Sequence, residues 1–332
     1  MHHRIFGKTG IKVSEIGFGA WAIGGTWGAT DDTESKAALH AALDAGTDFI
    51  DTADVYGDGH SERLIAEVLK NRQSANSGAR PFVATKAGRR LPAQTVEGYS
   101  EANLREWIDR SRKNLDMDTL DLVQLHCPPS ALYKNKTTFD ILDRLKAEGK
   151  IANYGVSVEK ISEALDAIKH PGVVCVQIIF NIFRQRVATD FLSAANSANV
   201  AVIARVPLAS GLLTGKMNGQ STFAKDDHRS FNRNGEFFDM GETFSGVPYH
   251  IGLEAVERIR PLVGDNSTMA AFALKWILMH DAISVVIPGA KTVVQAKANA
   301  IASSHSPLSK DVMGMVKAVY DQMLRPHVQA KW

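Results

Sequence analysis

The sequence contains few cysteines and no excess of charge of either sign. Cys127 and Cys175 are its two cysteines among 332 residues, too few for a disulfide framework and without zinc-binding spacing, so no metal site is expected. This content indicates a reducing compartment. Lysine and arginine number 38 and the acidic residues 36, which leaves a net charge of +2. The balance argues against nucleic acid or a membrane surface as a partner.

Long hydrophobic segments are also missing. No apolar run approaches the roughly 18 residues that a membrane span requires. The N-terminus, MHHRIFGKTG, lacks the apolar core of about 7–15 residues that a signal peptide carries. We therefore expect a cytoplasmic protein with no membrane segment. Hydrophobic residues still make up 45% of the chain, which is enough for a large core.

Short segments rich in valine and isoleucine alternate along the chain with segments of helical periodicity. Between these strand-like segments, residues 32–46 and 100–115 place apolar side chains at the intervals of an amphipathic helix. Regular alternation indicates a parallel sheet, and eight such units indicate a closed (β/α)8 TIM barrel that forms one domain over residues 1–332. The eight strands are expected at residues 15–19, 47–51, 81–86, 119–126, 151–157, 173–178, 200–204 and 283–287.

Two segments depart from this alternation. A Thr-Gly turn at residues 9–10 joins two short alternating runs, which predicts an N-terminal β-hairpin that caps the barrel. Residues 208–249, after the seventh strand, form a long polar segment with five phenylalanines. Loops of this length in compact domains are usually functional or disordered, and the aromatic content argues against disorder. We therefore expect a lid over the active site.

Three of the predicted strands end in ionisable residues. The second ends in Asp51, the third in Lys86 and the fourth in His126, while Tyr56 follows the second strand. The carboxyl ends of the strands surround the active site of such a barrel, so these side chains are expected to face one small volume. Taken alone, Asp51 is most simply a turn residue and Tyr56 a packing residue. Lys86 alone is most simply a surface residue, and His126 a structural one. Their joint occurrence at matched strand ends favours a catalytic site.

This set of side chains suits the reduction of a carbonyl group. A buried lysine favours the phenolate form of a neighbouring tyrosine and lowers its pKa, and an aspartate keeps the lysine charged. The tyrosine then becomes a general acid usable near neutral pH, and the histidine can donate a hydrogen bond to the carbonyl oxygen. The four residues do not follow the order of a hydrolase triad.

Other motif-like stretches carry less weight. GFGAWA at residues 17–22 matches a loose dinucleotide-binding pattern, but loop residues rather than a helix follow it. GLLTGK at residues 211–216 has the wrong spacing for a phosphate-binding P-loop. Cys127 could act as a nucleophile, although a structural or pocket-lining role is the simpler interpretation.

The segments around the four residues resemble those of the aldo-keto reductase superfamily. DTADVYGDGHSE at 51–62, VATKAG at 83–88 and DLVQLHCPP at 121–129 are similar to the family segments that carry its catalytic Asp and Tyr, its Lys and its His. The spacings of 5, 30 and 40 residues also agree, and the resemblance covers essentially the whole chain. It implies that Tyr56 is the proton donor, that Asp51 and Lys86 tune it, and that His126 orients the substrate carbonyl.

The same resemblance implies a nicotinamide cofactor. YGVSV at 154–158 and VQIIFN at 176–181 resemble the segments that hold the carboxamide and stack on the ring, with Val158 in place of the family's Asn. PLASGLLTGK at 207–216 resembles the loop over the pyrophosphate, and IPGAKTVVQAKAN at 287–299 the adenosine segment. The implied cofactor contacts are Gly19, Ala20, Trp21, Asp51, Ser157, Gln177, Phe180, Pro207, Leu208, Gly211, Leu213, Lys216, Ile287, Gly289, Lys291, Gln295 and Asn299. The implied substrate pocket is lined by Trp21, Trp27, Tyr56 and His126.

The choice of nucleotide depends mainly on Lys291. A cation beside the ribose suits a 2′-phosphate and favours NADP(H). Because Thr292 stands where many family members carry an Arg, NAD(H) stays open, and Lys291 could also be a surface lysine at a helix end.

We expect an oxidoreductase that transfers a hydride between NADP(H) and an aldehyde or ketone, with a small carbonyl or alcohol as its partner. One alternative is an NAD-dependent dehydrogenase of a sugar, polyol or pyridoxal-like alcohol, with which the lid residues Arg229, Asn232 and Arg233 are compatible. Another is a cofactor-sensing auxiliary subunit of a membrane channel. The physiological substrate, the reaction direction and the oligomeric state stay open.

Overall fold

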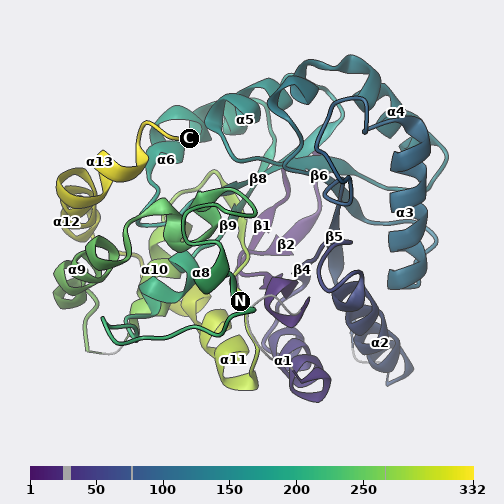
Figure 1. Ribbon diagram of the computed structural model, residues 1–332. Coiled ribbons are helices and arrows are strands. Elements are labelled where there is room, and N and C mark those ends of the chain that lie inside the picture. Colours follow the sequence, from purple (N-terminus) through teal and green to yellow (C-terminus); the bar gives the residue numbers. More distant parts are fainter. Residues whose placement is uncertain (25–30, 76–77, 266) are drawn as a thin grey trace.

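The protein is described by a computed structural model that covers residues 1–24, 31–75, 78–265 and 267–332 (Figure 1). Eight parallel strands follow one another in chain order around a single curled sheet. They are β3 (Phe18–Gly19), β4 (Phe49–Asp51), β5 (Phe82–Ala87), β6 (Leu122–His126), β7 (Tyr154–Ser157), β8 (Val173–Ile179), β9 (Ala201–Arg205) and β10 (Ile283–Val286). All eight predicted strands are confirmed, with ends shifted by up to three residues.

The first and last strands close the sheet into a barrel. The amide of Gly17 donates to the carbonyl of Val286 at 2.8 Å, and the amide of Gly19 donates to the carbonyl of Pro288 at 3.0 Å. In return, the amide of Val286 donates to the carbonyl of Glu15 at 2.9 Å. These bonds continue the parallel ladder from β10 to β3, which confirms the (β/α)8 barrel.

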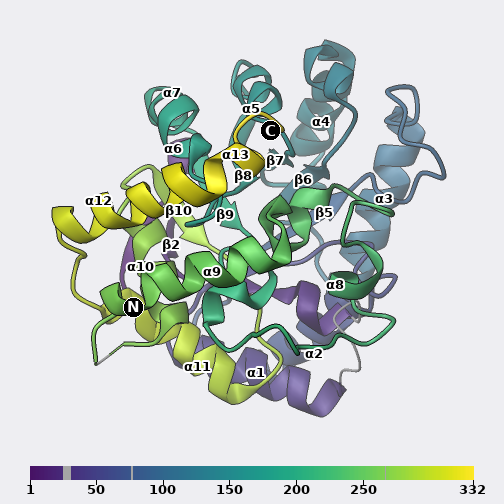
Figure 2. The same ribbon diagram turned by 60° about the vertical axis from the view of Figure 1, so that its left-hand side comes forward.

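Helices cover the outside of the barrel (Figure 1). Helices α1 and α3 confirm the predicted helical segments 32–46 and 100–115. Near the C-terminus, a π-helical turn at Tyr320–Leu324 joins α12 and α13 beside α9 (Figure 2). The helices are α1 (Asp32–Asp44), α2 (His60–Ser74), α3 (Glu101–Leu115), α4 (Lys136–Ala147), α5 (Ile161–Ala167), α6 (Arg186–Asp190), α7 (Leu192–Ser197), α8 (His228–Phe231), α9 (Tyr249–Ile259), α10 (Met269–Leu278), α11 (Val293–Ile301), α12 (Lys310–Val319) and α13 (Arg325–Val328).

The N-terminal hairpin closes one end of the barrel, as predicted. Strands β1 (His3–Ile5) and β2 (Lys12–Ser14) pair antiparallel. Phe6 between them is fully buried, and its ring lies 5.5 Å from that of Phe49 and 5.6 Å from that of Phe82. Since Phe49 and Phe82 begin β4 and β5, the hairpin covers the N-terminal ends of the strands and leaves the opposite mouth for the site.

The segment after β9 is the predicted lid, and it is largely ordered by its own polar contacts. It contains helix α8 and short helical turns at Ala209–Thr214, Met240–Glu242 and Phe244–Gly246. The hydroxyl of Ser210 donates to the carbonyl of Glu242 at 2.9 Å and accepts from the amide of Phe244 at 3.0 Å. The start of the lid is therefore tied to its end, over the mouth of the barrel.

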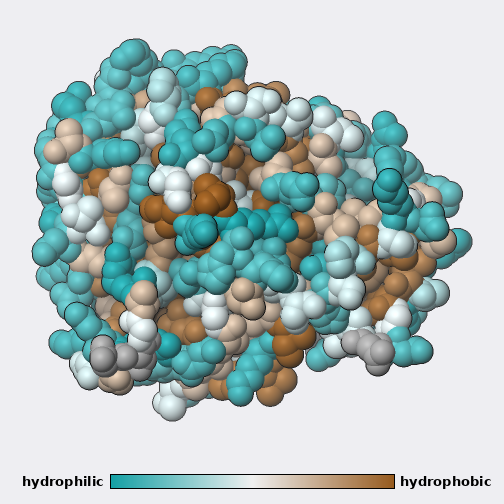
Figure 3. Space-filling view, turned by 180° about the vertical axis from the view of Figure 1, so that it is seen from behind, coloured by the Kyte–Doolittle hydropathy of each residue, from teal (hydrophilic) through white to brown (hydrophobic). Residues whose placement is uncertain are grey.

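On the side opposite to Figure 1, the described residues form no extended apolar face. Figure 3 shows hydrophilic residues over most of this side, with apolar residues in separate patches. Among the helices of the described residues, none is long and apolar enough to cross a membrane.

Candidate active site

The registers of neighbouring strands bring the polar strand ends together. Lys86 on β5 lies beside Gln124 on β6, and His126 on β6 lies beside Ser157 on β7. Ser157 in turn lies beside Gln177 on β8. These side chains are at least 96% buried. Parallel pairing places the carboxyl ends of all these strands at one mouth of the barrel, so the groups meet there.

Lys86 is the centre of the arrangement. Its Nζ donates to Oδ1 of Asp51 at 2.5 Å, to the carbonyl of Thr52 at 2.9 Å and to the hydroxyl of Tyr56 at 3.4 Å. Burial by itself lowers the pKa of Lys86, but the Asp51 carboxylate and the Tyr56 hydroxyl together raise it above its ordinary value. Lys86 is therefore charged, and the site is built around a buried cation.

The pKa of Tyr56 shifts in the direction opposite to the predicted one. Burial raises the pKa of its phenol, and the positive charge of Lys86, which lowers it, offsets only part of this effect. The lysine alone would lower this pKa, but burial of the ring outweighs it. Tyr56 is thus protonated at neutral pH, which is the form that a proton donor requires. The ring is held between Trp21, stacked at 6.1 Å, and His126, edge-on at 6.1 Å.

Two glutamine amides hold the second oxygen of Asp51. Nε2 of Gln177 donates to Oδ2 at 2.7 Å and Nε2 of Gln124 donates to it at 3.1 Å. Nε2 of Gln177 also donates to Oε1 of Gln124 at 3.1 Å. Sequence reasoning missed Gln124, although it stands two residues before His126 and a strand places such residues on the same face. The amides orient Asp51 toward Lys86.

His126 is neutral in this environment. Burial lowers its pKa well below the ordinary value, and the positive charges of Arg89, Lys86 and Arg205 lower it further. Its Nδ1 is buried and has no hydrogen-bond partner among the described residues. A neutral imidazole in this position can donate one hydrogen bond or accept one.

A cavity of about 490 Å³ runs from this group of residues along the mouth of the barrel. Asp51, Tyr56 and His126 lie at its catalytic end. It is also lined by the predicted cofactor residues Gly19, Trp21, Ser157, Gln177, Pro207, Leu208, Gly211, Lys216, Ile287, Gly289, Lys291, Gln295 and Asn299. The structure therefore gathers most of the predicted set along one continuous cavity.

Phe180 is not brought to this cavity. Residues of β8 alternate between the barrel interior and the helices, and Gln177 points inward to Asp51. Phe180, an odd number of positions later, is fully buried against Trp276 of α10 at 5.2 Å and His280 at 4.9 Å. The structure therefore provides no basis for its predicted stacking on a nicotinamide ring.

Two further predicted residues do not line the cavity, and a third lies outside the described residues. Ala20 and Leu213 are buried in the core and are not among the lining residues. Trp27 lies outside the described residues. Trp21, by contrast, lines the cavity beside Tyr56.

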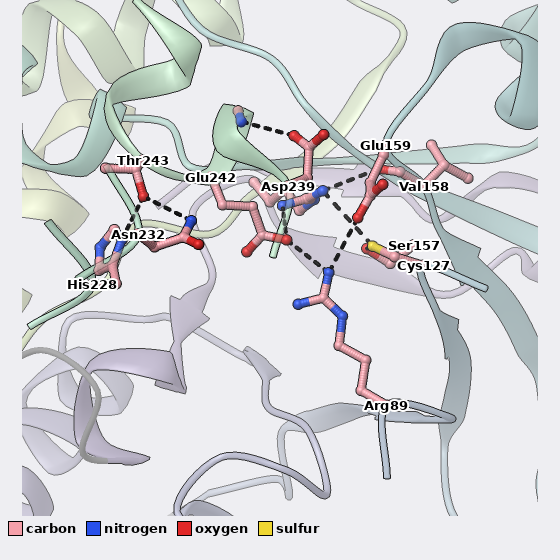
Figure 4. Close-up of polar contacts among 12 residues, drawn as sticks. Arg89, Cys127, Ser157, Val158, Glu159, His228, Asn232, Asp239, Glu242 and Thr243 are labelled. Carbon is pink, nitrogen blue, oxygen red and sulfur yellow. Dashed lines mark hydrogen bonds and ion pairs between the residues drawn. The ribbon is translucent and has the colours of Figure 1, made fainter. Parts of the chain in front are cut away.

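A cluster of charged residues that sequence reasoning missed borders the catalytic end (Figure 4). Nη2 of Arg89 donates to Oε1 of Glu242 at 2.9 Å, and Nη1 of Arg205 forms an ion pair with the same oxygen at 3.3 Å. Burial opposes ionisation of Glu242, but the two arginines lower its pKa to about 2. Arg205 is the last residue of β9, so its position at a strand end could have identified it from the sequence. Glu242 belongs to the lid, where no such signal exists.

The lid residues that were compatible with sugar binding have other partners. Asn232 is fully buried, and its Oδ1 accepts from the amides of Phe237 and Phe238 at 2.9 and 3.0 Å. The guanidinium of Arg233 lies 5.8 Å from the ring of Phe223, away from the cavity lining. Of the three residues, Arg229 alone is among those that line the cavity.

Comparison with known proteins agrees with this geometry. The model of the aldo/keto reductase family matches residues 15–321. The chain is 30% identical over 305 residues to aldo-keto reductase YhdN of Bacillus subtilis, covering 90% of this chain and 87% of that protein. Among solved structures, it is similar to aldo-keto reductase AKR11C1 of Bacillus halodurans in its holo form, with a TM-score of 0.76, 25% identity and 96% coverage of both chains. It is also similar to glycerol dehydrogenase AKR11B4 of Gluconobacter oxydans, with a TM-score of 0.74, 30% identity and coverage of 97% and 94%.

Proposed function

Because the chain belongs to the aldo/keto reductase family, we propose that it transfers a hydride between NADP(H) and an aldehyde or ketone, with Tyr56 as the proton donor. The observation that carries this proposal is the contact of one charged, buried Lys86 with both Asp51 and Tyr56. A protonated phenol at the end of a cavity, backed by a fixed cation, can deliver a proton and stabilise the phenolate that is left.

The reaction assigns one role to each group at the catalytic end. When bound, the cofactor supplies the hydride to the carbonyl carbon. A carbonyl oxygen at this end gains negative charge as the hydride arrives, and the hydroxyl of Tyr56 donates its proton to that oxygen. Lys86 stabilises the resulting phenolate, and Asp51 keeps Lys86 charged and in place. Neutral His126 orients the carbonyl by a hydrogen bond.

The other end of the cavity fits a phosphorylated nucleotide. Lys216, Arg229 and Lys291 place three cations along its lining. Gly211 adopts a φ of +100°, which lets the backbone approach a ligand without a side chain in the way. Lys291 would bind the 2′-phosphate, and Lys216 the pyrophosphate. These cations favour NADP(H) over NAD(H).

Replacing Tyr56 by phenylalanine tests the proposal. We expect Tyr56→Phe to reduce kcat by at least about a hundredfold, because the proton donor is lost while the ring is kept. The affinity for NADPH, measured by fluorescence titration, should change little. Tyr249→Phe, which removes a hydroxyl that donates to the carbonyl of Asn218 in an exposed hydrogen bond, is the matched control and should retain turnover. Wild-type turnover in Tyr56→Phe would contradict the assigned role.

Oxidation of an alcohol is the second candidate, since one of the similar structures is a glycerol dehydrogenase. The same groups would then act in reverse, with Tyr56 as a base. Its raised pKa favours the reductive direction at neutral pH. Assays in both directions, with both nucleotides, at pH 7 and pH 9 separate the two: faster oxidation at pH 7 would favour the dehydrogenase.

A further inference from the structure

Trp332 packs against the lid. Its indole Nε1 donates to both carboxylate oxygens of Asp239, at 3.0 and 2.9 Å, and the side chain is only 8% exposed. The ring lies over two glycines of the lid, Gly241 and Gly246, where an added Cβ would approach it to 3.1 and 2.3 Å. The absence of side chains at these two positions therefore leaves the space that the ring fills.

Two arginines hold Trp332 from the side of the barrel. The Cζ atom of Arg184 lies 3.9 Å from the centre of the indole ring, in a cation–π contact. Nη1 of Arg186 donates to the main-chain oxygen of Trp332 and, at 3.0 Å, to the carbonyl of Gln329. Arg184 lies between β8 and α6, and Arg186 begins α6. Trp332 therefore joins the lid to the segment that follows β8.

Hydrogen bonds connect this contact with the wall of the cavity. Asp239 precedes the lid turn that ends at Glu242, and its Oδ1 also accepts from an amide of that turn at 2.8 Å. Figure 4 shows Asp239 beside Glu242. The carbonyl of Glu242 accepts from the hydroxyl of Ser210 at 2.9 Å, and both of these residues line the cavity. The position of the cavity wall therefore depends on Asp239, which Trp332 holds.

The docked ring also covers a charge that is incompletely paired. Nη1 of Arg184 is buried and has no hydrogen-bond partner among the described residues. Burial lowers the pKa of this guanidinium to about 9, and the carboxylate of Asp239 offsets only part of the effect. Burying a charge costs free energy that is recovered when the group returns to water. The burial of Arg184 therefore opposes the docking of Trp332 and favours a contact that can open.

We propose that Trp332 is a latch that holds the lid closed over the cavity, and that the latch opens when the nucleotide enters or leaves. The inference rests on the nucleotide proposed for this cavity, but not on proton transfer by Tyr56. A weaker latch makes the open lid more frequent, which accelerates entry and exit together. The dissociation constant, as the ratio of the two rates, then changes less than either. Loss of a direct contact with the nucleotide would instead raise mainly the dissociation rate.

Release of NADPH tests the latch, followed by stopped-flow fluorescence after the complex is mixed with excess NADP+. We expect Trp332→Ala to raise the dissociation rate by at least about tenfold, since a hydrogen bond to a charged group and a cation–π contact are lost. The dissociation constant should rise by less than about threefold, because entry is accelerated too. Trp332→Phe keeps a ring and loses the indole N–H, so its dissociation rate should rise by about threefold. Met315→Ala, on the exposed side of α12, is the matched control and should release NADPH at the wild-type rate.

Digestion with trypsin measures the opening of the lid without any nucleotide. The lid contains cleavage sites such as Lys225 and Arg233. Trp332→Ala should be cut in the lid at least about threefold faster than the wild type, because an open lid is accessible to the protease. Gly241→Ala disturbs the latch from the other side, since its Cβ would approach Nη1 of Arg184 to 2.2 Å, and it should behave in the same way.

The outcomes separate this inference from the proposed function. A dissociation rate of Trp332→Ala within about twofold of the wild type, or a dissociation constant that rises as much as this rate, would overturn the latch. If the wild type does not bind NADPH, the nucleotide proposed for the cavity is contradicted. The digestion then decides, because equal cleavage of Trp332→Ala and the wild type would overturn the latch. Should melting curves show that Trp332→Ala does not fold, the same criteria apply to Trp332→Phe.

Discussion

The two ends of the cavity hold their charges in opposite ways. At the catalytic end, Lys86 and Asp51 are almost fully buried on adjacent strands, and each is bonded to other protein groups. At the other end, Lys216 and Lys291 sit on loops and are only partly covered. The first set of charges is complete before any ligand arrives. The second lies at the surface of the cavity, where the phosphates of the proposed nucleotide would meet it.

This difference has an energetic consequence. A buried pair is expensive to break, because the remaining charge cannot be solvated. A charge near solvent costs little to remove and is screened by salt. Changes at the catalytic end should therefore affect stability and turnover together, whereas changes at the nucleotide end should affect ligand affinity alone.

The largest effect is expected for Lys86→Met. Losing the cation leaves the Asp51 carboxylate buried and without its ion-pair partner, which should destabilise the fold by about 3–5 kcal/mol. It should also reduce kcat by at least about a hundredfold, since the phenolate of Tyr56 loses its support. Urea unfolding and steady-state kinetics measure the two effects.

A double variant and a surface control sharpen this test. Combining Lys86→Met with Asp51→Asn should restore part of the stability without restoring turnover, because the lone buried charge is removed. Lys70→Met, on the exposed face of α2, should change neither quantity. If Lys86→Met were as stable as the wild type, the contrast between the two ends would be wrong.

Asp54, which lies between Asp51 and Tyr56 in the chain, is a second buried carboxyl. It is fully buried, and neither of its side-chain oxygens has a hydrogen-bond partner among the described residues. Burial, and then the negative charge of Glu62, raise its pKa to about 7. The folded protein thus keeps this proton to higher pH than the unfolded chain does, whose carboxyl titrates near pH 4. Stability is therefore lost as the pH rises from about 4 to about 7.

Asp54→Asn should remove this loss. We expect the variant to gain about 2–3 kcal/mol relative to the wild type between pH 5 and pH 8, as measured by urea unfolding. Asp58→Asn is the control, because Arg90 and Arg110 lower the pKa of this exposed carboxyl instead of raising it. Its contribution is complete at both pH values, so its effect should not differ between them. A constant difference for Asp54→Asn would argue against the raised pKa.

The smallest effect is expected for Lys291→Ala at the nucleotide end. The affinity for NADPH should fall by about tenfold and that for NADH by less than about twofold, because NADPH alone carries the 2′-phosphate. Fluorescence titration measures both, and the difference should shrink at 1 M salt, where charges are screened within about 3 Å. Lys297→Ala, exposed on α11, is the matched control. Equal losses for both nucleotides would remove the assignment of Lys291.

Much of the catalytic end could be predicted from the sequence because its residues occur at strand ends. Buried strands show as short apolar runs, and a barrel brings their carboxyl ends together, so Asp51, Lys86 and His126 could be grouped without coordinates. Phe180 shows the limit of this reasoning. Its motif pointed to the cavity, but the alternation of β8 turns it toward α10.

The charged cluster could not be found in the same way. Arg89 stands in a loop and Glu242 in a short helical turn of the lid, and an ionisable residue in either place is most simply explained as solvated. They are brought together because the lid folds back over the end of β5, a contact between residues more than 150 positions apart that leaves Glu242 buried. Local patterns carry no information about such a pairing.

The sequence by itself determined the barrel, the hairpin that caps it and the strand ends at which Asp51, Lys86 and His126 stand. It could do so because hydrophobic periodicity and strand order are local properties that the barrel repeats eight times. Tertiary structure alone decided the direction in which the pKa of Tyr56 shifts, the orientation of Asp51 by two glutamines, and the pairing of Arg205 with Glu242. The physical reason is burial, since pKa values and ion pairs depend on which distant segments exclude water from a group.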